Sequence, residues 1–168
     1  ALQKAMRSLE QKGASFSFKP LSLSEAELAE LIEKTKVPTT QRIYQVQQAL
    51  LAGATVEQLH EATKIDPWFL DQLVLLNEVA GVVHAKRDNL DPETLKLAKR
   101  HGFSDAQIAE IIGSSEDVVR GVRHALGIRP VFKTVDTCAA EFEAFTPYHY
   151  SSYDLEDEVA HHEKPSIM

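Results

Sequence analysis

Apolar residues recur every three or four positions along most of the first 126 residues, a spacing typical of helices that bury one face. Side chains that cap helices stand at the expected starts. Ser24 with Glu27 and Thr55 with Gln58 form capping-box pairs, and an Asp-Pro pair begins two further segments. Single glycines follow most of the apolar segments, as is typical of helix ends. The pattern predicts helices over residues 1–10, 24–36, 40–53, a short stretch from 55, 66–85, 91–101, 104–112 and 115–126.

The residues after Gly127 lack this periodicity. Val131–Val135 has the β-branched composition of a strand but is too short to form a sheet alone. One or two helical turns are expected over 138–145, and extended chain lying on another surface is expected from Tyr148 onwards. The sequence therefore predicts an all-α protein with two small helical subdomains, 24–88 and 89–128, preceded by a linker over 13–23 and followed by a long irregular C-terminal tail, 129–168.

Charge and composition exclude several classes of protein. The 168 residues are 43% hydrophobic with a net charge of −7, and the last 38 residues hold two Lys or Arg against eight Asp or Glu. Because no basic surface is indicated, we expect no nucleic-acid partner. No apolar run approaches the roughly 20 residues that span a bilayer, so we also expect no membrane partner. The single cysteine excludes an internal disulfide and fits a cytoplasmic location.

Residues 104–127 have the spacing of a helix-turn-helix, in which a small residue, Ala109, lets two helices approach and Gly113 makes the turn. In a DNA reader, the start of the second helix would meet the bases. Here that start is Ser115, Glu116 and Asp117, and its carboxylates would repel phosphates. A structural helical corner is therefore favoured, with a small DNA-binding regulator as the alternative.

Three other features of the sequence contain residue types that can perform chemistry or bind a partner. Cys138, beside Ala139 and Ala140, is expected to be a buried structural cysteine, with a cysteine hydrolase as the alternative. His161-His162-Glu163 is expected to be solvated tail rather than a metal site. Trp68 and Phe69 are expected in the core, with an exposed anchor for a partner as the alternative. The sequence thus predicts no catalytic, cofactor-binding or metal-binding residue.

The run 127–142 (GIRPVFKTVDTCAAEF) and the run 146–153 (TPYHYSSY) closely resemble the large subunit of glutamine-dependent carbamoyl-phosphate synthase. The resemblance implies the non-catalytic oligomerisation domain between two ATP-grasp synthetase halves. Residues 1–12 would then be the last helix of the first half, and the tail would lead to the second half. It also implies that ATP and Mg²⁺ or Mn²⁺ belong to the parent enzyme and not to this fragment. The parent would bind a small glutaminase subunit and make carbamoyl phosphate for arginine and pyrimidine biosynthesis.

Self-association is expected to use the first helix after the linker. Apolar residues crowd this short helix and the chain before it, and a twofold-related copy could cover them. The candidates are Leu21, Leu23, Leu28, Leu31 and Ile32.

Overall fold

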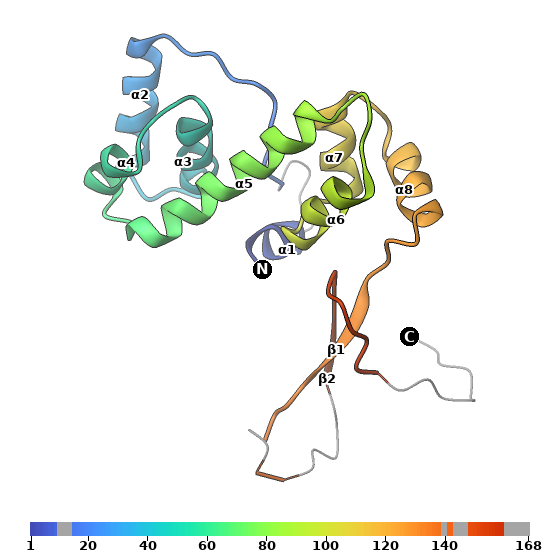
Figure 1. The fold of residues 1–168 in the computed structure, drawn as a ribbon. Coiled ribbons are helices and arrows are strands. Elements are labelled where there is room, and N and C mark those ends of the chain that lie inside the picture. The colour runs from blue at the N-terminus through green and yellow to red at the C-terminus, as the bar shows by residue number, and fades with distance from the viewer. Residues whose placement is uncertain (10–14, 139–140, 143–147, 160–168) are drawn as a thin grey trace.

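The computed structural model describes residues 1–9, 15–138, 141–142 and 148–159 (Figure 1). These residues form eight helices and a two-stranded sheet. The elements are α1 (Leu2–Arg7), α2 (Glu25–Thr35), α3 (Arg42–Leu51), α4 (Val56–Thr63), α5 (Pro67–Ala85), α6 (Pro92–Arg100), α7 (Asp105–Ile112), α8 (Glu116–Ala125), β1 (Val131–Val135) and β2 (Tyr148–Ser152).

The helix starts follow the predicted capping chemistry. Ser24 and Thr55 both form complete capping boxes, in which the side chain accepts from the third residue of the helix and that residue's side chain accepts from the cap backbone. The carboxylates of Asp66 and Asp91 accept backbone N–H groups of the first turn, and a proline follows each. Gly113 ends α7 in the left-handed conformation, at φ +71°.

The 19-residue helix α5 runs through the helical body and would be about 28 Å long at 1.5 Å per residue. Helices α3 and α4 pack on it towards one end, while α6 and α7 pack on it towards the other (Figure 1). Buried side chains from both sets of helices belong to one core cluster. Helix α5 thus packs against helices of both predicted subdomains, 24–88 and 89–128. The division at residue 88 stays a prediction.

The segment between α1 and α2 adds aromatic side chains to that core. Phe16 and Phe18 are buried, and the ring of Phe18 lies 4.7 Å from that of Phe103 between centroids. Phe16 also meets Phe18 and Tyr44 edge to face. Phe16 and Phe18 of the predicted linker therefore join the packing of the body.

The tail corrects the prediction of irregular chain. β1 pairs antiparallel with β2, and Lys133 lies opposite Tyr150. Val131–Val135, which is too short to form a sheet alone, pairs with another segment of the same tail. That segment, Tyr148–Ser152, was expected to lie extended on another surface. The protein is thus mainly helical, as predicted, with a hairpin extending from the body (Figure 1). The helix expected over 138–145 lies partly outside the described residues, and Cys138, Glu141 and Phe142 form turns and bends.

Candidate functional site

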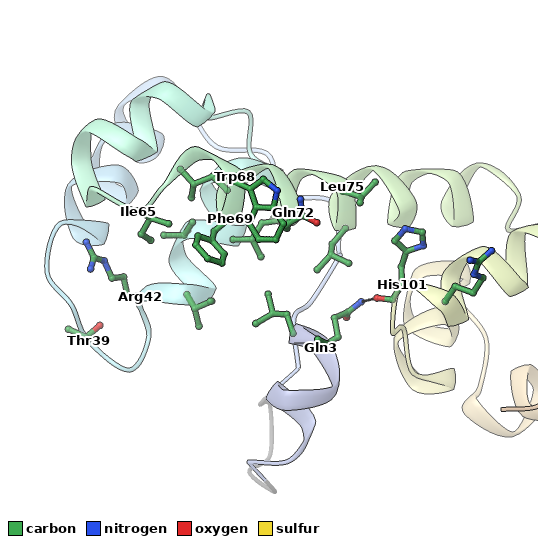
Figure 2. Close-up of a pocket in the computed structure, with 17 residues that line it drawn as sticks. Gln3, Thr39, Arg42, Ile65, Trp68, Phe69, Gln72, Leu75 and His101 are labelled. Carbon is green, nitrogen blue, oxygen red and sulfur yellow. Dashed lines mark hydrogen bonds between the residues drawn. The ribbon is translucent and has the colours of Figure 1, made fainter. Parts of the chain in front are cut away.

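An apolar groove of about 790 Å³ lies between α1, α3 and α5 (Figure 2). Side chains from the first residues of the chain form one wall, and the N-terminal half of α5 forms another. Most of the lining is aliphatic or aromatic, from Leu2, Ile43, Val46, Ile65, Trp68, Phe69, Leu70, Leu73, Leu75 and Leu76. Such a surface is suited to binding apolar groups.

The start of α5 places two large aromatic rings at this groove. The Asp66 carboxylate accepts the N–H of Trp68 at 2.9 Å, which fixes the first turn of the helix. The rings of Trp68 and Phe69 meet edge to face, with centroids 4.9 Å apart. These side chains are 61% and 59% exposed, so the prediction that they lie in the core is wrong. Leu70 and Leu73 take the core-facing positions of this turn instead, and the exposed-anchor alternative fits the structure.

Two of the polar side chains that line the groove, those of Arg42 and Gln3, are already engaged. The Arg42 guanidinium donates from Nε to the Thr35 carbonyl at 2.7 Å and from a terminal nitrogen to the Thr63 carbonyl at 2.9 Å. It thereby satisfies a carbonyl at the end of α2 and another at the end of α4. Gln3 donates to the His101 carbonyl at 2.9 Å, and its own carbonyl oxygen accepts from Gln107 at 2.9 Å. With these groups occupied, the groove fits apolar side chains of a polypeptide better than a polar small molecule.

A buried ionic cluster joins α6, α7 and α8. The Asp105 carboxylate lies 2.8 Å from Lys99 Nζ and 2.9 Å from a terminal nitrogen of Arg123, and all three side chains are at most 9% exposed. Arg123 also donates to the Ile128 carbonyl at 3.0 Å. The Tyr153 ring lies 5.0 Å from Lys99 Nζ and 5.9 Å from the Arg123 guanidinium, within the range of cation–π attraction. The cluster therefore holds Ile128, the last residue before the tail, and Tyr153, the residue after β2, against the helical body.

The charges of this cluster depend on one another. Burial alone would raise the pKa of Asp105, but hydrogen bonds from Arg123 and Lys99 outweigh it and hold that pKa below its usual value. Burial lowers the pKa of Lys99, and the hydrogen bond to Asp105 opposes this shift. The hydrogen bond to Asp105 raises the pKa of Arg123. Burial raises the pKa of Tyr153, so the phenol stays neutral near pH 7. A carboxylate that is paired with two cations stabilises the fold and is not available as a general base.

Sequence reasoning missed this cluster. Asp105 lies six residues after Lys99 and eighteen before Arg123, so no short motif joins the three. Asp105 also follows the Ser104 cap directly, and an acidic residue is common in the first turn of a helix, so its position alone did not indicate a buried ion pair.

The helix-turn-helix region has the predicted shape, with α7 and α8 packed together, but not the charge of a DNA reader. Glu116 and Asp117 stand exposed at the start of α8. Arg120 pairs with both of these carboxylates, and Arg123 is buried against Asp105. The arginines that would favour phosphate binding are therefore neutralised, and nothing supports the DNA-binding alternative.

The five self-association candidates lie in and before α2. Leu28, Leu31 and Ile32 are partly buried and pack against the core cluster. Leu23 is half-buried and Leu21 is exposed. The structure thus leaves part of each apolar side chain uncovered by this chain, and their role in self-association stays a prediction.

The remaining candidate groups are the Cys138 thiol and the residues His161-His162-Glu163. Cys138 is half-buried rather than fully buried as predicted, and the structure describes it as a free thiol. His161, His162 and Glu163 lie outside the described residues. Across residues 1–9, 15–138, 141–142 and 148–159, no three His, Cys, Asp or Glu side chains gather as a metal site would require. Within those same ranges no helix combines the length and the apolar character needed to cross a membrane.

Comparison with known proteins gives a consistent result. The family model described as carbamoyl-phosphate synthetase large chain, oligomerisation domain, matches residues 1–127. The carbamoyl phosphate synthase large chain of Pseudarthrobacter chlorophenolicus is 68% identical over 168 residues, and that of Kocuria rhizophila is 66% identical over 170 residues. The large chain of Streptomyces avermitilis is 62% identical over 168 residues. In each case all of this chain is matched, and it spans 15% of the length of the relative.

Proposed function

The chain belongs to the family of carbamoyl-phosphate synthetase large chain oligomerisation domains, and from this we propose that it connects parts of a longer large chain and mediates the self-association of that chain. It performs no chemistry itself. The observation that carries the proposal is the family match over residues 1–127, which covers the whole helical body. An exposed apolar groove and partly uncovered leucines on α2 support it, because connecting domains need surfaces for neighbours.

For the longer chain we propose the activity that the relatives' name states, synthesis of carbamoyl phosphate, with ATP and Mg²⁺ or Mn²⁺ bound outside these residues. Two observations on the described residues support placing the metal ion outside them. The buried carboxylate of Asp105 is held by Lys99 and Arg123, and metal-ligating side chains do not gather in the described ranges. The small glutaminase subunit as a partner, roles in arginine and pyrimidine biosynthesis, and a cytoplasmic location are further parts of the proposal.

For self-association we propose the surface formed by α2 and the residues before it. An isologous contact places the same patch on both copies, so a short helix with apolar residues on one side can pair with itself. Leu21 is exposed, and Leu23, Leu28, Leu31 and Ile32 remain partly exposed.

The test is the mass of the full-length large chain in sedimentation equilibrium. Leu28→Glu places a charge in the proposed contact and is expected to lower the oligomer mass. Ala29→Glu is the matched control, because it adds the same charge at the next, exposed position of the same helix. Leu21→Glu tests the same surface at a position outside α2. It is included because Leu28 packs on the core, so that Leu28→Glu could lower the oligomer mass through a folding defect.

If Leu28→Glu and Leu21→Glu both keep the wild-type mass, the α2 surface is not the contact. A wild-type large chain that sediments as a single copy would contradict self-association itself.

A further inference from the structure

We propose that α1 and the tail hairpin dock on the helical body as one cooperative unit, and that the Tyr153 side chain holds this unit in place. Both dock on the same short stretch, residues 99–105, which contains the turn between α6 and α7 and is called the anchor segment below. The coupling depends on contacts within this chain. It therefore goes beyond the proposed function and does not require self-association.

Helix α1 is fixed to two backbone carbonyls of the anchor segment. The Gln3 side chain donates to the His101 carbonyl at 2.9 Å (Figure 2). The Arg7 guanidinium donates to the Gly102 carbonyl at 2.7 Å. A Cβ atom at Gly102 would lie only 3.3 Å from Gln3 Cβ, so the helix packs closely on the turn. The position of α1 therefore depends on where the anchor segment holds these carbonyls.

The hairpin is attached at the two ends of the same segment, through Tyr153. The ring lies 5.0 Å from Lys99 Nζ and 5.9 Å from the Arg123 guanidinium, and both cations pair with Asp105. Cation–π attraction is stronger at such desolvated charges than at exposed ones. Tyr153 also packs against the core cluster. Most residues of β1 and β2 are exposed, so the strands themselves contribute little to this attachment.

Helix α1 and the hairpin also meet directly. Lys4 Nζ donates to the Ser151 carbonyl of β2 at 3.1 Å. Burial raises the pKa of Tyr153, and the charges of Arg123 and Arg7 oppose that shift. Arg7 of α1 therefore lies within electrostatic reach of the ring that attaches the hairpin.

These contacts make the two attachments depend on each other. Without the Tyr153 ring, water would reach the pair of Lys99 and Asp105, and a higher local dielectric constant would weaken their attraction. Because these two residues end the anchor segment, its turn would then hold the acceptors of α1 less firmly. A coupling free energy is reciprocal, so loosening α1 would also loosen the hairpin.

Hydrogen–deuterium exchange of the full-length large chain, measured on its peptides by mass spectrometry, tests the coupling, because amide exchange reports local opening. Tyr153→Leu removes the ring and keeps an apolar side chain. Tyr153→Phe keeps the ring and removes only the hydroxyl. Tyr150→Leu is the matched control, because Tyr150 is a 49% exposed tyrosine on the same hairpin, opposite Lys133. Arg7→Gln loosens the attachment from the α1 side.

We expect Tyr153→Leu to speed exchange at least about fivefold in α1 as well as in β1 and β2, the lower end of the usual range for coupled sites. Tyr153→Phe and Tyr150→Leu should leave exchange in α1 as in wild type, and Arg7→Gln should speed exchange in the hairpin.

Faster exchange in the hairpin alone would show independent docking and overturn the proposal. Exchange that rises equally in α2 and α4 would show general destabilisation and overturn it too. If Tyr153→Leu does not fold, Arg7→Gln decides, and an unchanged hairpin in that variant contradicts the coupling. None of these results depends on the oligomer mass that tests the proposed function.

Discussion

Replacing Asp105 with alanine should destabilise the fold more than a surface charge change of the same kind. The carboxylate lies 2.8 Å from Lys99 Nζ and 2.9 Å from Arg123, and each side chain is at most 9% exposed. Alanine would leave two cations buried without this counter-charge. Removing one partner of a buried ion pair costs about 3–5 kcal/mol, most of it the penalty of the unpaired charge. For a domain of this size that corresponds to a fall in Tm of roughly 6–20 °C.

The free energy of unfolding is measured by urea titration of wild type, Asp105→Ala, Asp105→Asn and Glu93→Ala. Glu93 is the matched control, because its carboxylate pairs with Lys96 at 3.4 Å on the surface, where such a pair contributes about 0–1 kcal/mol. Asp105→Asn keeps the shape and removes the charge, so it should lose most of the same stability. If Asp105→Ala is no less stable than Glu93→Ala, the cluster does not support the fold as argued.

Three further predictions follow from particular residues. The pKa of Asp105 is lower in the folded protein than in the unfolded chain, so its contribution to stability is present above the ordinary pKa of about 3.9 and is lost as pH falls through the folded pKa. The difference in the free energy of unfolding between wild type and Asp105→Asn, measured by urea titration, should therefore shrink below about pH 4. A difference that stays constant with pH would contradict this. Gly81→Ala should raise the free energy of unfolding by about 0.5–1 kcal/mol, because Gly81 lies within α5 with open space around it. Gly113→Ala should lower the free energy of unfolding by roughly 1 kcal/mol, because φ at Gly113 is +71°. Equal effects of the two substitutions would refute this distinction. Mixed-sequence duplex DNA should give no gel shift at low salt because Arg123 is buried, and a shift would contradict the structural interpretation of α7 and α8.

The helices were predictable because the chemistry that starts them is local. In the pairs Ser24 with Glu27 and Thr55 with Gln58, both members of the capping box stand three residues apart, so the sequence contains the whole interaction. The end of α4 shows the limit of this reasoning. Lys64 adopts the left-handed conformation at φ 59°, although nothing in its side chain favours it.

Contacts between distant residues were not predictable in this way. Pairing of β1 with β2 depends on which residues meet across the intervening chain. In Tyr148–Ser152 the alternation of an aromatic with a polar residue stops after Tyr150, so it is too short to indicate a strand. The ionic cluster has the same character, because Asp105 and Arg123 become partners only once α7 packs on α8. Each residue alone has the ordinary position of a charged residue on a helix.

The error at Trp68 and Phe69 arises from α5 as a whole. The helix is apolar on nearly every face, a composition that predicts burial on all sides. In the structure its inner face is buried through residues such as Leu73 and Val83, but Trp68, Leu75 and Val82 stay exposed at intervals of seven residues along another face. A helix whose composition is suited to complete burial, but which its own chain covers on one side only, leaves an apolar face exposed. The composition of α5 and its burial in the structure therefore disagree at this exposed apolar face.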